Sequence, residues 1–412
     1  MNHQPLQYAS LKSVILSLEP NVRFNLARKL PSIRTAEKGT PLKIDNLRFE
    51  NNTIVVNDTE YKLSVYRKYH VERPPVEVSG TLLHDLDEYG FEKAASNDLL
   101  PGDVRISNSA YYSVFEDDKY FIKMNLVDYE QKLKNIRGST VDLLYYKKRV
   151  NDYRQRLLPF EYRQNQQKSP CDLYYQLTIR NKSGIQSTYR IPCYERLHIG
   201  MKQLTEMLFG KRQDVWSVNH MNLDVPILRW PVSGTLPFVR NLRIGDLESI
   251  NIETLKSIIH PSSFPLNTLE ISLSNLDQRE FDNNMITEAT LLTLEGVPSK
   301  DHLIRIQNSQ VFIKYDISPG EFYDLVRHWL QHGRPIGTYF TFDFDHVDPY
   351  ECLIRISTFP GVVERSERLI KLSMKNSLVL VVSKNKLIVD VNCYTRIDYW
   401  TVEMKVVHQS VV

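Results

Sequence analysis

Apolar side chains recur at a helical period in the first forty residues. One stripe at positions i, i+3, i+4 and i+7 comprises Leu11, Val14, Ile15 and Leu18. This spacing places them on one face of a helix, with Ser10 as its N-cap and Pro20 just beyond its end. Asn21 is placed to cap a second helix, and Pro31 starts a third short segment. Three such short helices bury little area by themselves, so we expect residues 1–40 to dock on another surface.

The hydrophobic period changes to two between residues 41 and 116. Alternating apolar runs occupy residues 42–49, 54–56 and 61–65. They are separated by the polar pairs Asn51-Asn52 and Asn57-Asp58. Polar turn pairs between alternating runs are typical of β-hairpins. We therefore predict a β-hairpin-rich module over residues 41–116.

Residues 117–168 are rich in charged side chains, with apolar positions at irregular helical spacing. The apolar positions are Met124, Val127, Leu133, Ile136, Val141, Leu144, Val150 and Leu157. Because this spacing does not form a clean heptad, we predict a charged helical connector broken near Gly138-Ser139. The alternative is a dimerising coiled coil, through which the chain would form a homo-oligomer.

An apolar-x-apolar strand pattern recurs within residues 169–345. It occurs at Trp216-x-Val218, Leu242-x-Ile244, Leu269-x-Ile271-x-Leu273, Leu292-x-Leu294 and Val311-x-Ile313. Two intervening segments, residues 252–259 and 322–329, have helical spacing. One strand and one helix every 20–29 residues is the geometry of leucine-rich repeats, so we predict a leucine-rich-repeat-like α/β module. An α/β layer of unrelated strands is the alternative, because the recurrent Asn or Cys of such repeats is absent.

Residues 346–412 have the pattern of an antiparallel meander. The strand-like runs are residues 369–372, 378–382, 387–391 and 399–406. Lys375-Asn376 and Lys384-Asn385 separate them as two-residue polar turns. The predicted fold class is thus a multi-module α+β or α/β chain. Its segments are residues 1–40, 41–116, 117–168, 169–345 and 346–412.

Composition excludes several function classes. The chain of 412 residues is 42% apolar and carries a net charge of only +3, which argues against nucleic-acid or membrane partners. Residues 1–5 do not begin a secretory signal, and no run approaches the roughly 18 apolar residues that span a bilayer. The four cysteines form no C-x-x-C pair. We expect reduced thiols and a cytoplasmic or nuclear location.

Motifs for catalysis, cofactors and metals are not found. Phosphate-loop, dinucleotide-binding and nucleophile-elbow sequences do not occur, so we expect a non-enzymatic protein without a cofactor. His328 and His332 share a helix face, but Trp329 stands where a zinc protease needs Glu. We interpret the two histidines as positively charged side chains near the C-terminus of a helix, and we expect them to bind no metal. The cluster Asp343 to Asp348 is expected to be a solvated strand edge, with cation binding as the alternative.

Two sets of residues resemble known families. The first set has the spacing of an F-box and comprises Pro5, Leu6, Leu11, Val14, Ile15, Leu18, Pro20, Phe24, Leu26, Leu30 and Ile33. The second set spans most of the chain and comprises residues 20–24, 31–38, 41–44, 87–91 (DEYGF), 100–104 (LPGDV), 207–210 (MLFG), 262–269 (SSFPLNTL), Trp329 and 333–338 (GRPIGT). It is similar to the nematode-expanded F-box C proteins, a family of unknown function with an F-box-like N-terminus.

The resemblance implies a substrate-recognition adaptor of a cullin-type ubiquitin ligase. In F-box proteins the apolar face of the helices packs on a Skp-type linker protein, and the remaining chain holds a protein target. The residues that would face the linker or form the core are Leu6, Leu11, Val14, Ile15, Leu18, Leu26 and Leu30. The bulky aromatic near the end of many F-boxes is missing where Ser32-Ile33-Arg34 stands. A non-enzymatic scaffold or homo-oligomer that has lost linker binding is therefore the alternative.

Overall fold

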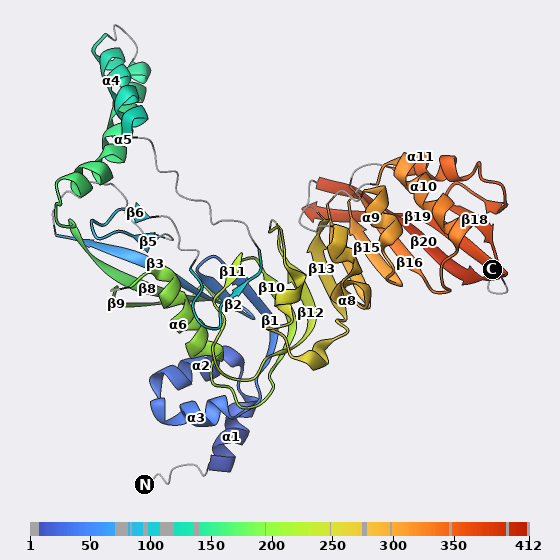
Figure 1. The fold of residues 1–412 in the computed structure, drawn as a ribbon, viewed down its shortest axis with the longest axis horizontal. Helices are drawn as coiled ribbons and strands as arrows, with labels where there is room; N and C mark the ends of the chain where they lie inside the picture. The colour runs from blue at the N-terminus through green and yellow to red at the C-terminus, as the bar shows by residue number, and fades with distance from the viewer. Residues whose placement is uncertain are drawn as a thin grey trace.

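One large mixed sheet runs through the chain. The computed structural model describes residues 8–70, 81–82, 85–93, 98–107, 119–135, 140–193, 195–247, 249–273, 278–296, 299–315, 317–345, 348–392 and 395–409. Within these ranges the sheet has sixteen strands, and β9 and β17 are its two edges. Its order is β17-β18-β19-β20-β16-β15-β14-β13-β12-β10-β1-β2-β3-β8-β9, with β4 paired to β3 (Figure 1).

The centre of the sheet is a run of parallel strands. They are β1 (Lys43–Glu50), β10 (Ser217–Leu223), β12 (Phe238–Ile244), β13 (Thr268–Ser272), β14 (Leu291–Glu295), β15 (Gln310–Lys314) and β16 (Tyr339–Asp345). From β12 to β16 each strand pairs with the next in the sequence, and β10 pairs with β12. The strand patterns predicted between residues 216 and 313 are confirmed, because each overlaps one of these strands.

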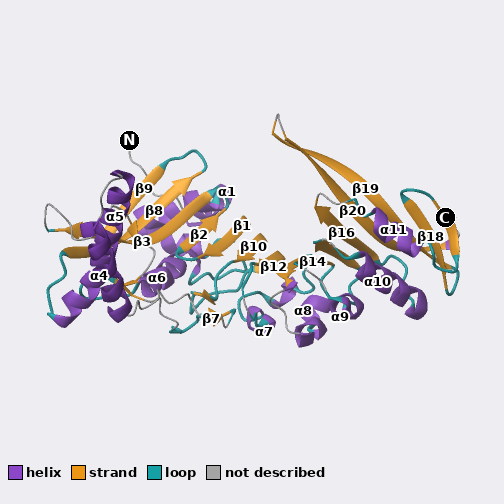
Figure 2. Cartoon of the chain, turned by 90° about the horizontal axis from the view of Figure 1, so that it is seen from above, coloured by secondary structure: helices purple, strands orange, loops and turns teal. Residues whose placement is uncertain are grey.

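Helices follow the parallel strands from β12 to β16, and all but α10 are short. They are α7 (Ile252–Leu255), η2 (Pro261–Ser263), η4 (Gln278–Asp282), α8 (Asn284–Thr287), α9 (Lys300–Arg305), α10 (Pro319–His332) and α11 (Tyr350–Ile356). The strands follow an arc with α7, α8, α9 and α10 on its outer side (Figure 2). Ser318 caps α10 by accepting from the N–H of Glu321 at 3.2 Å, and Gly333 ends it with a positive φ.

An antiparallel unit extends the sheet beyond β1. It consists of β2 (Thr53–Val56), β3 (Thr59–Tyr69), β4 (Thr81–Leu82), β8 (Cys171–Asn181) and β9 (Gln186–Pro192), with α6 (Leu197–Phe209) packed on β3. The hairpins predicted at Asn51-Asn52 and Asn57-Asp58 are confirmed, and Asn52 and Asn57 adopt positive φ. Two small sheets accompany this unit, β5 (Asp85–Leu86) with β6 (Glu92–Lys93) and β7 (Val104–Arg105) with β11 (Ile227–Leu228).

A helical hairpin projects from this unit (Figure 1). It consists of α4 (Lys119–Asn135) and α5 (Thr140–Gln164), which pack together through Ile122, Tyr153 and Leu157. The predicted charged helices are confirmed, although Gly138-Ser139 lies outside the described residues. In the described part of the chain, no helix has both the length and the apolar content needed to cross a bilayer.

The C-terminal strands continue the same sheet. They are β17 (Val362–Arg365), β18 (Leu369–Met374), β19 (Leu378–Asn392) and β20 (Thr395–His408), and β20 pairs with β16. The predicted turn at Lys375-Asn376 is confirmed, but the predicted turn at Lys384-Asn385 is wrong, since β19 passes straight through it. Lys384 fits inside the strand because its amine reaches Asp348 Oδ1 at 3.0 Å and lies over the Trp400 ring.

In the described residues 8–42, three short α-helices and one 3-10 turn precede β1. They are α1 (Tyr8–Ser17), α2 (Pro20–Lys29) and α3 (Arg34–Lys38), with the 3-10 turn η1 (Pro31–Ile33) between α2 and α3. The predicted helices are thus present, but Glu19 rather than Asn21 caps α2. The Glu19 carboxylate accepts from the N–H groups of Asn21 and Val22 at 2.8 and 3.3 Å. Leu6 lies outside the described residues.

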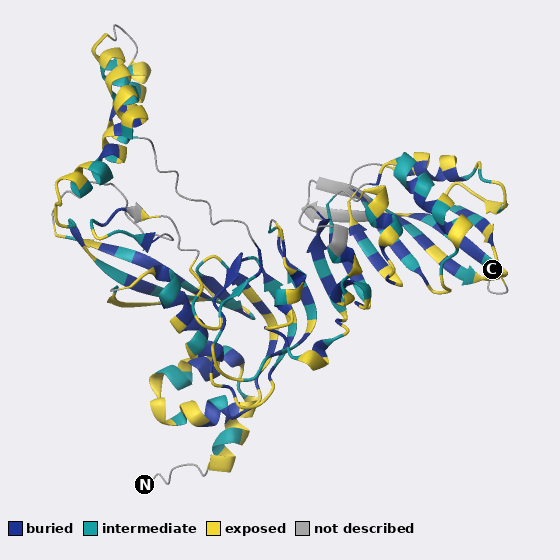
Figure 3. Ribbon diagram, viewed as in Figure 1, coloured by how far each residue is buried: buried dark blue, intermediate teal, exposed yellow. Residues whose placement is uncertain are grey.

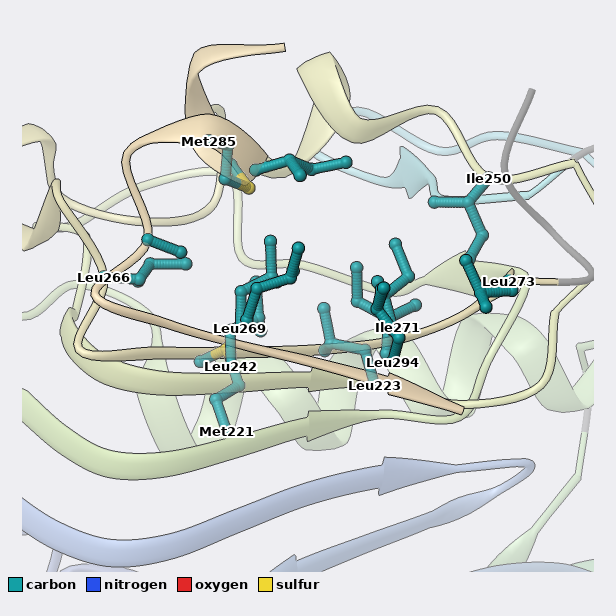
Figure 4. Packing of buried hydrophobic residues seen from close by; sticks show 14 of the residues in the cluster. Met221, Leu223, Leu242, Ile250, Leu266, Leu269, Ile271, Leu273, Met285 and Leu294 are labelled. Atoms are coloured by element: carbon teal, nitrogen blue, oxygen red, sulfur yellow. The ribbon is translucent and has the colours of Figure 1, made fainter. Parts of the chain in front are cut away.

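A continuous apolar core lies between the sheet and its helices. Figure 4 shows Leu242 and Leu269 on neighbouring strands, below Met285 of α8. One buried amide also supports this layer, because Asn308 donates to the carbonyls of Ile286 and Ala289 at 2.6 and 3.0 Å. The opposite face of the parallel strands, here called the open face, carries the partly exposed charged side chains of Arg243, Glu270, Glu295 and Lys314.

Candidate functional site

The first two helices present apolar side chains to solvent. Val14 and Leu16 of α1 are 45% and 53% exposed, and Tyr8, Val22 and Leu30 are similarly exposed. Figure 3 shows that much of this helical cluster is exposed, with buried positions where it meets the body. Exposed apolar groups gathered on one small module are unfavourable in water unless a partner covers them.

The predicted linker-facing residues differ in their exposure to solvent. Val14 and Leu30 are exposed, and Leu11, Leu18 and Leu26 are half-buried. Ile15 is only 2% exposed, in a helix that packs against α3, so it belongs to the core. Leu16 is as exposed as Val14 but lies off the predicted stripe, so the periodicity alone did not identify it.

A buried ionic cluster fixes these helices to the body. Arg23 of α2 and Arg212 both reach Glu37 Oε1 of α3, at 3.2 and 3.0 Å. All three side chains are at most 2% exposed. Arg23 also donates to the carbonyls of Pro41 and Thr40 at 2.7 and 2.9 Å. Burial lowers the pKa of Arg23 and of Arg212, and the Glu37 carboxylate opposes this effect.

Lys38 adds a second anchor at the C-terminus of α6. Its amine donates to the carbonyls of Met207 and Leu208 at 2.8 and 2.9 Å. These carbonyls are among those that a helix end leaves without internal partners. Burial, followed by the positive charge of Arg212, lowers the pKa of Lys38 to about 7. Lys38 is therefore partly neutral at physiological pH.

Contacts with the first hairpin orient α2 further. The Tyr61 hydroxyl of β3 donates to Asn21 Oδ1 at 2.9 Å, and the Asn21 amide donates to the Val56 carbonyl at 3.1 Å. Asn57 Nδ2 donates to Glu19 Oε1 at 3.2 Å. The rings of Tyr61 and Phe209 both lie edge-on to Phe24. The inner side of the helical cluster is therefore fixed, while its outer side stays open.

The open face of the parallel strands carries a cross-strand charge network. Arg243 reaches Glu270 at 3.0 Å and Glu295 at 3.4 Å, and Lys314 reaches the same two carboxylates at 2.6 and 3.3 Å. These residues come from β12, β13, β14 and β15. Burial raises the pKa of Glu270, but hydrogen bonds from Lys314 and Arg243 outweigh this and lower it. Because these four charges pair with one another, the network links β12 to β15 across the strands.

A cavity of about 350 Å³ lies beside the aromatic side chains of Phe209, Trp216 and Trp230. Asp103 on its wall is fully buried and pairs with Lys202 at 2.9 Å and with Arg229 at 2.6 Å. These pairs hold residues 98–107 against α6 and the loop after β11. The Asp103 carboxylate on the cavity wall is therefore already paired with two cationic side chains, which gives it a structural role.

The two histidine candidates of α10 lie side by side. The His328 and His332 rings stack at 4.2 Å, and burial followed by the charge of His332 lowers the pKa of His328. Across the described ranges, no group of three or more His, Cys, Asp or Glu side chains could hold a metal ion. The predicted strand edge at Asp343 to Asp348 is wrong for the strand as a whole, because β16 lies inside the sheet between β15 and β20, and Asp343 itself pairs with Thr401 of β20. His346 and Val347 of this cluster lie outside the described residues.

Comparisons with known proteins add one finding about the middle of the chain. No curated protein and no solved structure matches the chain. Residues 196–346 match a protein family described as Domain of unknown function (DUF3557). The matched range begins at α6 and covers the parallel strands from β10 to β16. It therefore includes the charge network but neither the front helices nor α4 and α5.

Proposed function

We propose that this protein is a non-enzymatic substrate-recognition adaptor of a cullin-type ubiquitin ligase. In this proposal the N-terminal helices form an F-box-like module that binds a Skp-type linker protein, and the α/β body binds a protein target. The observation that carries it is the contrast within the helical cluster. Its inner side is fixed by the Arg23–Glu37–Arg212 cluster, whereas Val14 and Leu16, which flank the buried Ile15 on α1, are exposed.

The architecture of the body supports a target-binding role. Sequentially ordered parallel strands with helices on the outer side of an arc are the geometry of leucine-rich-repeat-like solenoids. Such solenoids bind partners on the face that their strands present. Here that face carries Arg243, Glu270, Glu295 and Lys314. An adaptor of this type acts in the cytoplasm or the nucleus.

The linker proposal is tested by a pull-down of the full chain with a purified Skp-type linker. The charged variants Val14→Asp and Leu16→Asp should abolish recovery, because they place a carboxylate in a desolvated contact. Ile336→Asp is the matched control, since Ile336 is 62% exposed but follows α10 at a distance from the helical cluster. Equal recovery with all three variants, or no recovery of the unchanged chain, would remove the linker-binding role.

The second candidate is a homo-oligomeric scaffold that uses α4 and α5. Tyr120, Met124 and Val127 of α4 are exposed at spacing i, i+4 and i+7, on the face opposite the packed residue Ile122. Light scattering should then give a dimer that Met124→Glu dissociates. A monomer at all accessible concentrations would rule out this candidate.

A further inference from the structure

The two edges of the sheet differ in how well they are protected. β17 has four residues, its pairing with β18 shifts register between Val362 and Glu364, and Glu364 pairs with Lys371 at 2.7 Å. Short length, irregular register and charge are features that prevent further strand pairing. β9 has seven residues and pairs with β8 without a register shift. No described strand covers its outer side, so β9 is an open edge.

The backbone of β9 presents free hydrogen-bonding groups. Asn181 N–H donates to the Ile185 carbonyl at 3.1 Å, and Cys193 N–H donates to the Leu173 carbonyl at 2.9 Å. In an antiparallel pair the direction of these groups alternates along the strand. Positions 187, 189 and 191 therefore face β8. Gln186, Thr188 and Arg190 direct their N–H and C=O groups outward.

The side chains along β9 favour apolar contacts on one side. Ile185, Tyr189 and Ile191 lie at alternate positions, on the same side of the sheet as the core residue Tyr175. Ile185 and Ile191 are nevertheless 66% and 58% exposed. A strand added beyond β9 would bring its own apolar side chains next to them.

The charges that flank β9 are positive. Arg28 of α2 donates to the Tyr189 hydroxyl and to Asn25 Oδ1, at 2.8 and 2.9 Å. Arg190 donates to Gln176 Oε1 at 2.7 Å and lies 3.6 Å from the centre of the Tyr66 ring. All these contacts are with neutral groups. Neither arginine has a carboxylate partner in the described part of the chain. Arg28 lies beside Tyr189 of β9, whereas the Arg190 guanidinium lies over the neighbouring strands β8 and β3.

We infer that β9 is a docking edge for an extended acidic peptide segment of a protein target. The segment would add an antiparallel or parallel strand through the outward groups of Thr188 and Arg190. Its apolar residues would contact Ile185 and Ile191, and a carboxylate would reach Arg28, while Arg190 adds positive charge on the inner side of β9. Pairing with a second copy is disfavoured, because it would bring these arginines together. This inference deepens the target-binding half of the proposed function and does not depend on linker binding.

Fluorescence anisotropy of the full chain with a labelled peptide, Glu-Val-Thr-Val-Thr-Val-Glu, tests the inference. Thr188→Pro removes an outward N–H without removing a bond to β8, and should weaken binding about tenfold. Val363→Pro on β17 is the matched control and should leave the affinity unchanged. Arg28→Gln should weaken binding about threefold to tenfold and reduce its dependence on salt, and Arg190→Gln, whose charge lies further from the added strand, should have a smaller effect. The thermal unfolding midpoint of each variant verifies that it remains folded.

Two further peptides complete the test. Lysine in place of glutamate, or proline in place of the central valine, should abolish binding. Absence of binding by the unchanged chain, equal affinity for all three peptides, or equal affinity of Thr188→Pro would overturn the inference. A dimer in sedimentation analysis that Thr188→Pro dissociates would also overturn it, in favour of a second copy. Thr188→Pro should still recover the linker protein in the pull-down. A loss of peptide binding can therefore be distinguished from a loss of linker binding.

Discussion

The ionic cluster beneath the front helices gives a quantitative prediction. Glu37→Gln keeps the shape of the side chain but leaves two buried arginines without a counter-charge. Arg23 would retain acceptors at the carbonyls of Pro41 and Thr40, whereas Arg212 would retain the Leu208 carbonyl at 3.1 Å. Removal of one partner from a buried ion pair costs about 3–5 kcal/mol. We expect a loss of this size in the free energy of unfolding.

Urea denaturation compares this variant with a surface control. Glu50→Gln breaks the Arg48–Glu50 pair, whose atoms are 2.8 Å apart but whose side chains are more than 40% exposed. Its cost should stay within about 1 kcal/mol. Adding Arg212→Met to Glu37→Gln should recover part of the loss, because it removes an unpaired buried charge. Equal losses for Glu37→Gln and Glu50→Gln would refute the reasoning.

Three other predictions concern the effect of single residues on stability. Between about pH 7 and 10.5 the unfolded chain holds a proton that folded Lys38 has lost, so stability should rise with pH across this window. Lys38→Gln should remove that rise, and identical urea midpoints against pH for the two proteins would contradict it. Leu292→Ala should cost about 2–5 kcal/mol, whereas Val141→Ala, at an exposed position, should change the unfolding midpoint little. Gly102→Ala should destabilise by about 1–3 kcal/mol in the same assay, because φ is +82° and the new Cβ would lie 3.0 Å from the Pro231 carbonyl oxygen.

Local patterns in the sequence predicted most of the individual strands and helices. The apolar-x-apolar signature identified β10 and β12 to β15, because their buried residues all face one layer of helices. Turn residues identified the hairpins at Asn52 and Asn57, whose positive φ values suit asparagine. These features depend only on residues close together in the chain.

Long-range pairing was not predictable in the same way. β3 pairs with β8 although the paired residues Tyr69 and Cys171 are separated by a helical hairpin, and no local signal specifies that register. Lys384 looked like part of a turn because its partners Asp348 and Trp400 are remote in sequence. The exposed position of Leu16 likewise depends on which side of α1 meets the body.

The base of the helical hairpin has a consequence for how this chain can vary. Lys119 Nζ at the start of α4 donates to Gln164 Oε1 at the end of α5 at 2.8 Å, so the two ends of the hairpin lie side by side. If the hairpin became longer or shorter by whole helical turns, the distance between its two ends and the register of β3 with β8 would stay the same. The entropic cost of closing the loop also grows only slowly with its length. Among descendants of a common ancestor, insertions and deletions should therefore accumulate at the tip of this hairpin, while the distance between the strands it interrupts stays constant.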